Sequence, residues 1–162
     1  MSNSPLVQYT KISHHKTTGR NHMIDTITIH HMAGDLSIET CGNVFQSREA
    51  SSNYGVDSKG RIGMYVEEKD RSWCSSSSSN DDRAITIEVA DFNKKWEISS
   101  QAMASLINLV VDICNRNNIS KLVWSELKAD RINHKNGCNM TVHRDFTSTT
   151  CPGDYLYSKM PY

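Results

Sequence analysis

Two runs, residues 25–31 and 84–90, constrain the fold more than any other part of the chain. Along each run isoleucine or valine takes every second position, which is the pattern of a β-strand with one buried face. Apolar residues with the spacing of a helix occur between the two runs and after the second one. Strands that interleave with helices predict an α/β or α+β domain, with one sheet and helices packed against it.

The other elements follow from local patterns. The chain predicts a helix over 36–45, two short strands over 53–56 and 61–66 joined by a hairpin turn at 57–60, a long helix over 99–117, and a short C-terminal helix from Pro152 through Met160. Residues 1–24 are expected to be irregular and residues 118–140 loop-rich. These elements predict a single domain of 162 residues, which is long enough for a real core.

Two segments carry more specific expectations. The long helix is predicted to bury one apolar stripe, made of Met103, Leu106, Ile107, Val110, Val111 and Cys114. Five consecutive serines, Ser75–Ser79, predict a flexible loop that forms a lid or rim.

Charge and hydropathy exclude several classes of partner. The chain carries 18 basic and 18 acidic residues, so nothing in it favours nucleic acid or an anionic membrane. No apolar run is long enough to span a bilayer, and we expect no membrane insertion. The N-terminus lacks a basic-then-apolar signal segment, so we expect a protein that is made in a cytoplasm.

The cysteines are not arranged as a disulfide framework. They lie at positions 41, 74, 114, 138 and 151, an odd number without paired spacing and without a Cys-x-x-Cys motif. Cys41 and Cys114 lie on predicted helix faces and are interpreted as small buried hydrophobic residues. His134 and Cys138 have three residues between them, but no partner pattern supports a metal site there.

A late stretch, residues 141–153, offers two metal ligands. His143 and Cys151 have seven residues between them, and the cysteine runs directly into Pro-Gly. An imidazole and a thiolate on one loop are natural ligands for zinc. The first strand ends in His30 and His31, and alternation directs His30 away from the core, so it is the candidate third ligand. Two histidines and one cysteine leave a fourth position for water, as in catalytic zinc sites.

Glu88 lies in the middle of the second alternating strand. A carboxylate there is costly to bury unless it is paired or used. One interpretation is a functional carboxylate; the other is a glutamate that faces solvent on a half-exposed sheet. The residue pattern alone leaves both open.

These residues together suggest metal-assisted hydrolysis of an amide. Zinc lowers the pKa of a bound water, and a carboxylate such as Glu88 can accept its proton during attack on a carbonyl. A cysteine hydrolase that uses Cys151 and His143 is an alternative. The adjacent Pro152 and the additional His30 fit a metal ligand better than a nucleophile.

Four ordered motifs resemble one family. They are Thr26-Ile-Thr-Ile-His-His-Met-Ala-Gly34, the segment Ser52–Ile62 (Ser-Asn-Tyr-Gly-Val-Asp-Ser-Lys-Gly-Arg-Ile), Ala84-Ile-Thr-Ile-Glu-Val-Ala90, and Val142-His-Arg-Asp followed by Cys-Pro-Gly-Asp154. Together they are similar to zinc-dependent N-acetylmuramoyl-L-alanine amidases of the type-2 amidase family, above all to phage endolysin catalytic domains. Peptidoglycan recognition proteins share that fold. The resemblance spans roughly residues 25–157.

The resemblance implies a central mixed β-sheet flanked by helices, with one zinc ion in a groove. It implies His30, His143 and Cys151 as the zinc ligands, matched motif by motif. Glu88 matches the strand glutamate that serves as general base in bacterial and phage members. Thr149 matches a position close to the scissile carbonyl, where relatives carry lysine or threonine.

The chain departs from the family in the shell that contacts substrate. Asn53-Tyr54 stands where many relatives have a His-Tyr-like pair, and Trp73-Cys74 stands where many have Trp-His. Asn53, Tyr54 and Trp73 are predicted to line the groove. His31 is predicted to lie beside the metal ligands and to contribute to substrate binding.

The family implies hydrolysis of the amide between N-acetylmuramic acid and L-alanine in peptidoglycan. The alternative is a recognition module that binds peptidoglycan without cutting it, but such modules lose the cysteine ligand, which this chain keeps. Residues 1–162 are predicted to be one catalytic domain, and no wall-binding domain is visible in them. We expect a monomer that acts on the cell wall after release.

Overall fold

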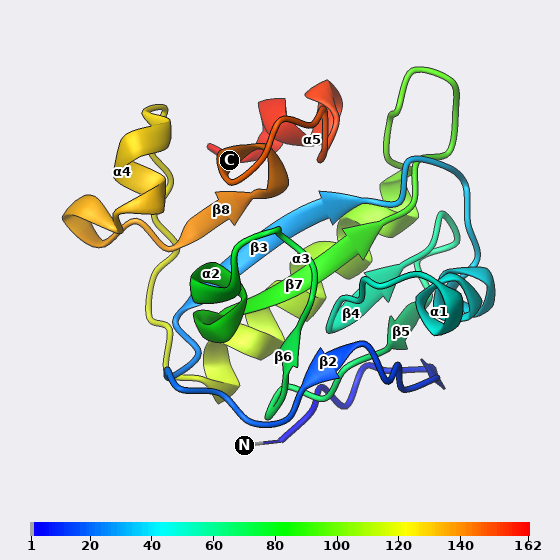
Figure 1. Cartoon of the computed structure of the whole chain (residues 1–162). Coiled ribbons are helices and arrows are strands. Elements are labelled where there is room, and N and C mark those ends of the chain that lie inside the picture. The colour runs from blue at the N-terminus through cyan, green and yellow to red at the C-terminus, as the bar shows by residue number, and fades with distance from the viewer. Residues whose placement is uncertain (1) are drawn as a thin grey trace.

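The computed structural model describes residues 2–162 and contains one mixed six-stranded sheet with helices around it (Figure 1), as predicted. The strand order is β1-β5-β4-β7-β3-β8. The strands are β1 (Tyr9–Thr10), β5 (Ile62–Met64), β4 (Tyr54–Val56), β7 (Ala84–Val89), β3 (Thr26–His31) and β8 (Met140–Val142). A second sheet pairs β2 (Lys16–Thr17) with β6 (Arg71–Ser72) in antiparallel fashion.

The centre of the large sheet is parallel. β3 pairs with β7 on one side and with β8 on the other, and β4 is also parallel to β7. Only the β4–β5 hairpin is antiparallel, with its turn at the predicted position. Because parallel strands end at the same edge, whatever follows β3, β7 and β8 is brought together there.

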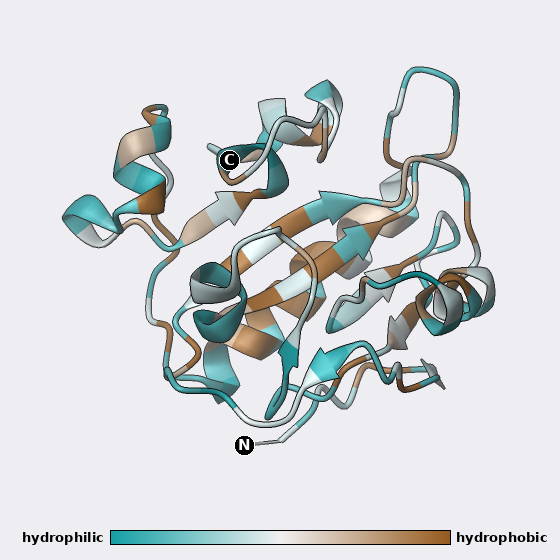
Figure 2. Ribbon diagram, in the orientation of Figure 1, coloured by the Kyte–Doolittle hydropathy of each residue, from teal (hydrophilic) through white to brown (hydrophobic). Residues whose placement is uncertain are grey.

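One face of the sheet is apolar. The side chains of Ile27, Ile29, Ile85 and Ile87 are almost fully buried and belong to one core cluster. The helix α3 (Ser100–Arg116), capped by the Ser99 hydroxyl, packs behind this face. Figure 2 shows hydrophobic bands along β3 and β7 that alternate with hydrophilic ones, as expected for period-two strands.

The other face is polar yet also buried. The hydroxyl groups of Thr28 and Thr141 lie 2.8 Å apart, and the Asn80 amide donates to Thr28 at 2.9 Å. Asn80 lies on α2 (Ser78–Arg83), which covers this face. A network of small polar side chains therefore takes the place of apolar packing beneath α2.

The serine run was predicted to be a flexible loop that forms a lid or rim; the loop was wrong, whereas Ser76, Ser77 and Ser78 line a cavity, as expected for a rim. The Ser77 hydroxyl caps α2 by accepting from the backbone amide of Asn80 at 3.3 Å, and Ser78 and Ser79 form the first residues of the helix. Ser75 is fully buried, and its hydroxyl and backbone amide donate to Asp81. A serine composition that suggests flexibility is here organised by capping.

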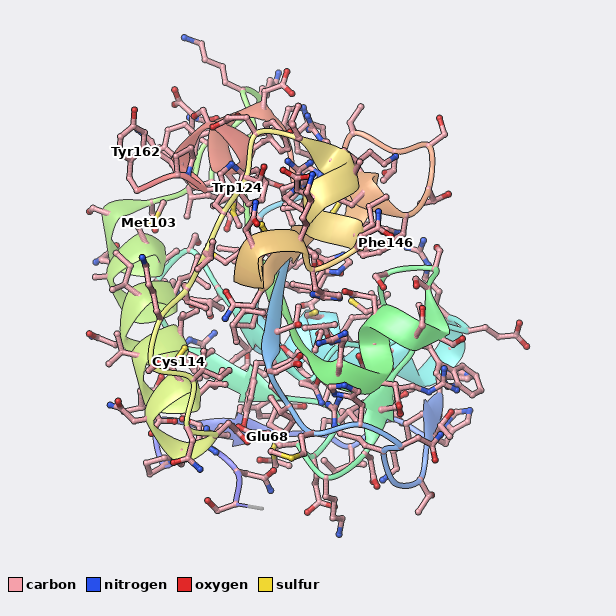
Figure 3. The ribbon with its side chains drawn as sticks, turned by 90° about the vertical axis from the view of Figure 1, so that its left-hand side faces the viewer. Glu68, Met103, Cys114, Trp124, Phe146 and Tyr162 are labelled. Atoms are coloured by element: carbon pink, nitrogen blue, oxygen red, sulfur yellow. The ribbon has the colours of Figure 1, made fainter. Side chains whose placement is uncertain are left out.

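The predicted apolar stripe of α3 was also partly wrong. The helix buries Ala102, Leu106, Leu109 and Ile113 most completely. Ile107 and Val111 are 55% and 53% exposed, while Met103 and Val110 pack against the core cluster only partly. Cys114 is half-buried, whereas Cys41 is buried as expected; Figure 3 shows Met103 and Cys114 along α3.

The segments predicted to be irregular contain short elements. Residues 1–24 hold β1 and β2, and residues 118–140 hold α4 (Lys128–Ile132), the 3-10 turn η1 (Lys135–Gly137) and the start of β8. Strands of two or three residues carry too little periodicity to be recognised in sequence. The remaining helices are α1 (Ile38–Ser47), the 3-10 turn η2 (His143–Asp145) and α5 (Asp154–Lys159). None of the helices in residues 2–162 combines the length and apolarity that crossing a membrane requires.

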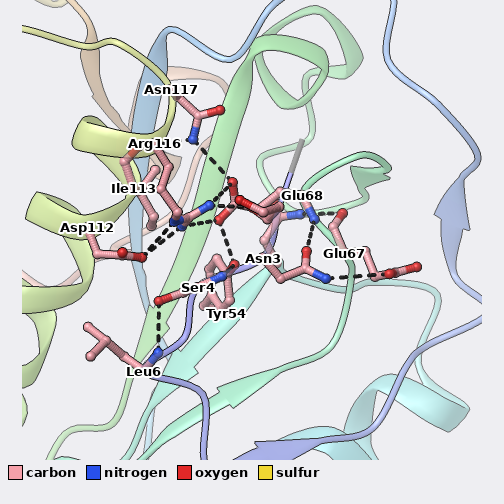
Figure 4. A network of polar contacts seen from close by, with 12 residues as sticks. Asn3, Ser4, Leu6, Tyr54, Glu67, Glu68, Asp112, Ile113, Arg116 and Asn117 are labelled. Carbon is pink, nitrogen blue, oxygen red and sulfur yellow. Dashed lines mark hydrogen bonds and ion pairs between the residues drawn. The ribbon is translucent and has the colours of Figure 1, made fainter.

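A buried carboxylate ties the N-terminal segment to α3 (Figure 4). Glu68 is fully buried and accepts from the Arg116 guanidinium at 2.6 and 2.9 Å and from the Tyr54 hydroxyl at 2.6 Å. Asn117 donates to the same carboxylate at 3.2 Å, and Ser4 donates its backbone amide to the Tyr54 hydroxyl. One acidic group thus links three separate parts of the chain.

We expect Glu68→Ala to lower the free energy of unfolding by about 3 kcal/mol, because it leaves the Arg116 charge and two polar groups without their buried acceptor. Urea denaturation at pH 7 measures the change. Glu67→Ala is the matched control, since that side chain is 32% exposed and pairs with Lys69 at the surface, where ion pairs contribute little. Equal effects of the two substitutions would contradict a special role for Glu68.

Candidate metal centre and cleft

The site forms where the parallel strands end. His30 and Glu88 are register partners near the ends of β3 and β7. His143 follows β8 directly as the first residue of η2. Cys151 comes from the loop that precedes α5. Strand pairing therefore brings together residues that are far apart in sequence.

Three of these residues form a candidate metal-binding group. One ligand atom each from His30, His143 and Cys151 lies within 4.8 Å of the others. The Cys151 Sγ lies 3.6 Å from His30 Nδ1, and the two imidazole rings are 4.7 Å apart between centroids. A zinc ion with tetrahedral bonds of about 2.1 Å to nitrogen and 2.3 Å to sulfur separates those atoms by about 3.6 Å.

The protonation tendencies of the group also fit a metal. Burial, together with the neighbouring His143 and His31, holds the pKa of His30 well below its ordinary value. Burial lowers the pKa of His143 as well, so both rings are neutral, as metal ligands must be. Burial and the Glu88 carboxylate raise the pKa of the Cys151 thiol; a bound cation has the opposite effect and favours the thiolate.

Neighbouring backbone and side chains fix the position of Cys151. The backbone amide of His31 donates to the Cys151 Sγ at 3.4 Å. The His31 ring contacts Asp91 through Nδ1 at 3.0 Å and is 5% exposed. Gly153, with φ of 82°, packs against that ring, and a Cβ there would lie 3.2 Å from His31 Nδ1. His31 therefore orients the ligand loop.

Two arginines fix the loop from the other side. The backbone amide of Arg144 donates to the Cys151 carbonyl at 3.1 Å, and its guanidinium stacks on Tyr157 at 4.5 Å. Arg131 is buried and pairs with Asp145, two residues after His143 in η2. The segment with the candidate ligands is thus held by an ion pair near His143 and by a backbone hydrogen bond at Cys151.

Glu88 faces the same site rather than open solvent. The side chain lines the cleft, and its Oε2 is a buried atom without a hydrogen-bond partner among residues 2–162. Burial is the main reason that the pKa of Glu88 is raised to about 8; the charge of Arg48 opposes this shift and the smaller effect of Asp91 adds to it. An unpaired buried carboxylate is costly, so its place beside the candidate ligands favours the functional interpretation.

Two cavities with shared lining residues lie at the candidate site and are together called the cleft. The inner cavity has a volume of about 240 Å³ and contains Glu88, His143 and Cys151 in its lining. The outer cavity, about 370 Å³, shares His143 and Trp73 with the inner one. The α1 side of the inner cavity is apolar, whereas the outer cavity is lined mainly by polar and charged side chains.

The predicted groove residues divide into two groups. Trp73 is 40% exposed and lines both cavities, and Thr149 lines the inner one, where its hydroxyl accepts from the Cys151 amide at 3.3 Å. Asn53 and Tyr54 are fully buried and do not line either cavity. Asn53 bonds to the backbone of Thr86, so the positions of Asn53 and Tyr54 give no support to a contact with substrate.

Sequence reasoning missed three cleft residues. The Cys74 Sγ lies 4.0 Å from Glu88 Oε1, the Ser76 hydroxyl lies 3.4 Å from His143 Nε2, and Arg48 lines both cavities. None belongs to a periodic pattern. The departure at Trp73-Cys74 was the one signal in the sequence that pointed toward Cys74.

A second group overlaps the first. His30, Cys74 and Glu88 also place ligand-type atoms within 4.8 Å of one another, so Glu88 lies close to the metal-binding group. His134 and Cys138 are not in such a group: the His134 ring bonds to the Cys138 carbonyl at 3.0 Å.

Solved structures share this fold. The endolysin amidase LysCS from Clostridium intestinale URNW has a TM-score of 0.68 at 19% identity, covering 99% of this chain and 95% of that one. The Ph2119 endolysin of the Thermus scotoductus MAT2119 bacteriophage gives 0.59 at 18% identity, covering 87% and 84%. Drosophila peptidoglycan recognition protein SD gives 0.64 at 16% identity, covering 89% and 83%. At such identities the likeness shows the fold alone.

The sequence comparison is more specific. No curated protein matches the chain in a sequence search. The Amidase_2 family profile, described as N-acetylmuramoyl-L-alanine amidase, matches residues 19–154. This match confirms the resemblance seen in the four motifs. The chain belongs to the Amidase_2 family of N-acetylmuramoyl-L-alanine amidases.

Proposed function

We propose that this protein is a zinc-dependent hydrolase that cuts the amide between N-acetylmuramic acid and L-alanine in peptidoglycan. The observation that carries the proposal is the grouping of His30, His143 and Cys151 within 4.8 Å, with Glu88 lining the same cavity as His143 and Cys151 and its buried Oε2 without a partner in the described chain. Family membership supplies the substrate class. We further propose that it acts on the wall after release from the cell that makes it.

The ligand set fits one zinc ion. His30 and His143 would supply neutral imidazoles and Cys151 a thiolate, which leaves one tetrahedral position open. Zinc, when bound there, polarises a water molecule and the substrate carbonyl as a Lewis acid. His31 and Arg144 keep the Cys151 loop in place, so the thiolate is ready to bind without rearrangement.

Glu88 is the proposed general base. Its buried Oε2 has no other partner in the described chain, so it is free to accept the proton of the attacking water. The same proton can then pass to the nitrogen of the departing L-alanine. A raised pKa suits both steps, since the carboxyl must gain and lose one proton per cycle.

Thr149 lies at the cleft wall beside Cys151. Its hydroxyl can donate a hydrogen bond to the carbonyl oxygen as negative charge develops. It cannot supply a positive charge, so its contribution is a positioned dipole.

The cysteine-hydrolase alternative has little support from the geometry. Burial raises the pKa of the Cys151 thiol, and it lowers the pKa of the His143 imidazole that this alternative uses as the base. Neither group therefore activates the other as a nucleophile and base would.

We expect Cys151→Ala to lose the stoichiometric zinc that the purified protein retains, because two imidazoles alone rarely hold the ion. Metal analysis after dialysis measures the loss. Cys138→Ala is the control: that thiol is also buried but lies outside the ligand group, and its loss should leave one equivalent of zinc. Retention of one equivalent by Cys151→Ala would show that the site is misassigned.

We expect Glu88→Gln to retain zinc and to lower kcat by at least about a hundredfold, which is the usual contribution of a positioned general base. Peptide release from purified cell walls measures the rate. Glu126→Gln, an exposed glutamate away from the cleft, should leave the rate unchanged. Full activity in Glu88→Gln would remove this carboxylate from the mechanism.

The decisive test is digestion of purified walls with and without a zinc chelator. We expect new L-alanine amino termini, no new reducing sugar ends, loss of activity on chelation and recovery on adding zinc. Wall binding without new termini would instead favour a recognition module. Cleavage that persists after metal removal would refute the zinc mechanism.

A further inference from the structure

Most arginines of this protein already have a partner. Five pair with carboxylates: Arg61, Arg83, Arg116, Arg131 and Arg144. Arg20 donates to several backbone carbonyls. Within residues 2–162, the Arg48 side chain makes no hydrogen bond or ion pair, and Arg71 donates to the Thr17 hydroxyl at 2.7 Å but to no carboxylate.

Both of these arginines line the outer cavity of the cleft. Arg48 is the C-cap of α1 and lines both the inner and the outer cavity. Arg71 lines the outer cavity, and its hydrogen-bond partner Thr17 also accepts from the Trp73 ring at 2.9 Å. Arg48 lines the inner cavity together with Glu88 and His143.

Nearby acidic groups do not neutralise this pair. Asp81 lines the outer cavity, but its carboxylate already accepts from the backbone amides of Cys74 and Ser75 and from the Ser75 hydroxyl. Glu49 is exposed at the cavity edge and has no ion pair with Arg48. The outer cavity therefore presents two guanidinium groups without carboxylate partners.

We propose that Arg48, assisted by Arg71, binds the α-carboxylate of the second residue of the stem peptide. The inference rests on the proposed function. In a muramyl peptide the first residue after the cut amide is a neutral alanine. The second is D-glutamate joined through its side chain, so its α-carboxylate is the first negative group beyond the cut, unless it is amidated. A planar guanidinium suits such a carboxylate because it can donate two parallel hydrogen bonds.

The two ends of the cleft differ in the way this requires. In the inner cavity, Met32, Leu36 and Phe45 are apolar and offer nothing to an anion, and Arg48 is the only arginine or lysine among the described residues of its lining. The outer end carries the two arginines and the serine hydroxyls that precede α2. A peptide chain advances at most about 3.6 Å per residue, so the second residue still lies close to the catalytic group, within reach of Arg48.

Two synthetic ligands that differ by one group test the subsite. They are N-acetylmuramoyl-L-alanyl-D-glutamate, with a free α-carboxylate, and N-acetylmuramoyl-L-alanyl-D-isoglutamine, with an amide there. Binding is measured by calorimetry on the zinc-loaded Glu88→Gln protein, which does not consume them. We expect the acid to bind about tenfold more tightly, as for one charge-assisted bidentate contact, with a smaller ratio at high salt.

Adding Arg48→Gln should bring that ratio close to one, while Arg48→Lys should keep part of it. Lys128→Gln removes an exposed charge on α4 and should leave the ratio unchanged. Zinc content and thermal unfolding check that each variant is folded. Equal affinities of the two ligands, or a preference that survives Arg48→Gln, would overturn the subsite.

Cleavage by the unsubstituted protein separates this result from the proposed function. A preference for the acid in binding, without cleavage of wall or ligand, supports the subsite while refuting the amidase. Cleavage of both ligands at equal kcat/KM supports the amidase and refutes the subsite.

Discussion

The parallel pairing of β3 with β7 and β8 is the constraint on which the rest of this structure depends. Each strand brings one residue of the candidate site to the same edge: His30 and Glu88 as register partners, and His143 directly after β8. These residues come from three distant parts of the chain. Hydrogen bonds of the strand ladder therefore set the distances of the site before any metal binds, and the ligand atoms need little further ordering on binding.

The two buried faces of the sheet differ in composition and in what they pack against. The isoleucine face packs on α3 and contributes most of the apolar burial. The opposite face carries Thr28 and Thr141, satisfied by Asn80 of α2, and leads up to the cleft. A polar buried face is marginal in free energy unless its groups find partners. Among the described residues, two buried atoms of this face have none, His30 Nε2 and Glu88 Oε2, and both belong to the candidate site.

Sequence predicted those features that depend on residue type and local periodicity. His30 and Glu88 were placed by strand alternation, and His143 and Cys151 by their chemistry, with the roles of all four still predictions. The exposure of Ile107 and Val111 could not be foreseen, because a wide apolar stripe fits several rotations of α3 and only packing selects one. Arg48 and Cys74 were missed because tertiary contacts alone bring them to the cleft. The prediction of a flexible loop over the serine run was wrong because composition does not reveal that Ser77 caps a helix.

The two sides of the site differ in how firmly their side chains are held in place. The ligand side is held by His31 with Asp91, by Gly153 against the His31 ring, and by Arg144 on the Cys151 carbonyl. On the opposite rim, the Arg48 side chain is less constrained, because it has no hydrogen-bond or ion-pair partner within residues 2–162, while the partly exposed Trp73 ring donates to Thr17. Fixed candidate ligands would keep the proposed zinc ion in one geometry. For the proposed substrate, whose sugar is constant while the charge of its peptide varies, we expect specificity to reside at the rim and chemistry at the strand ends.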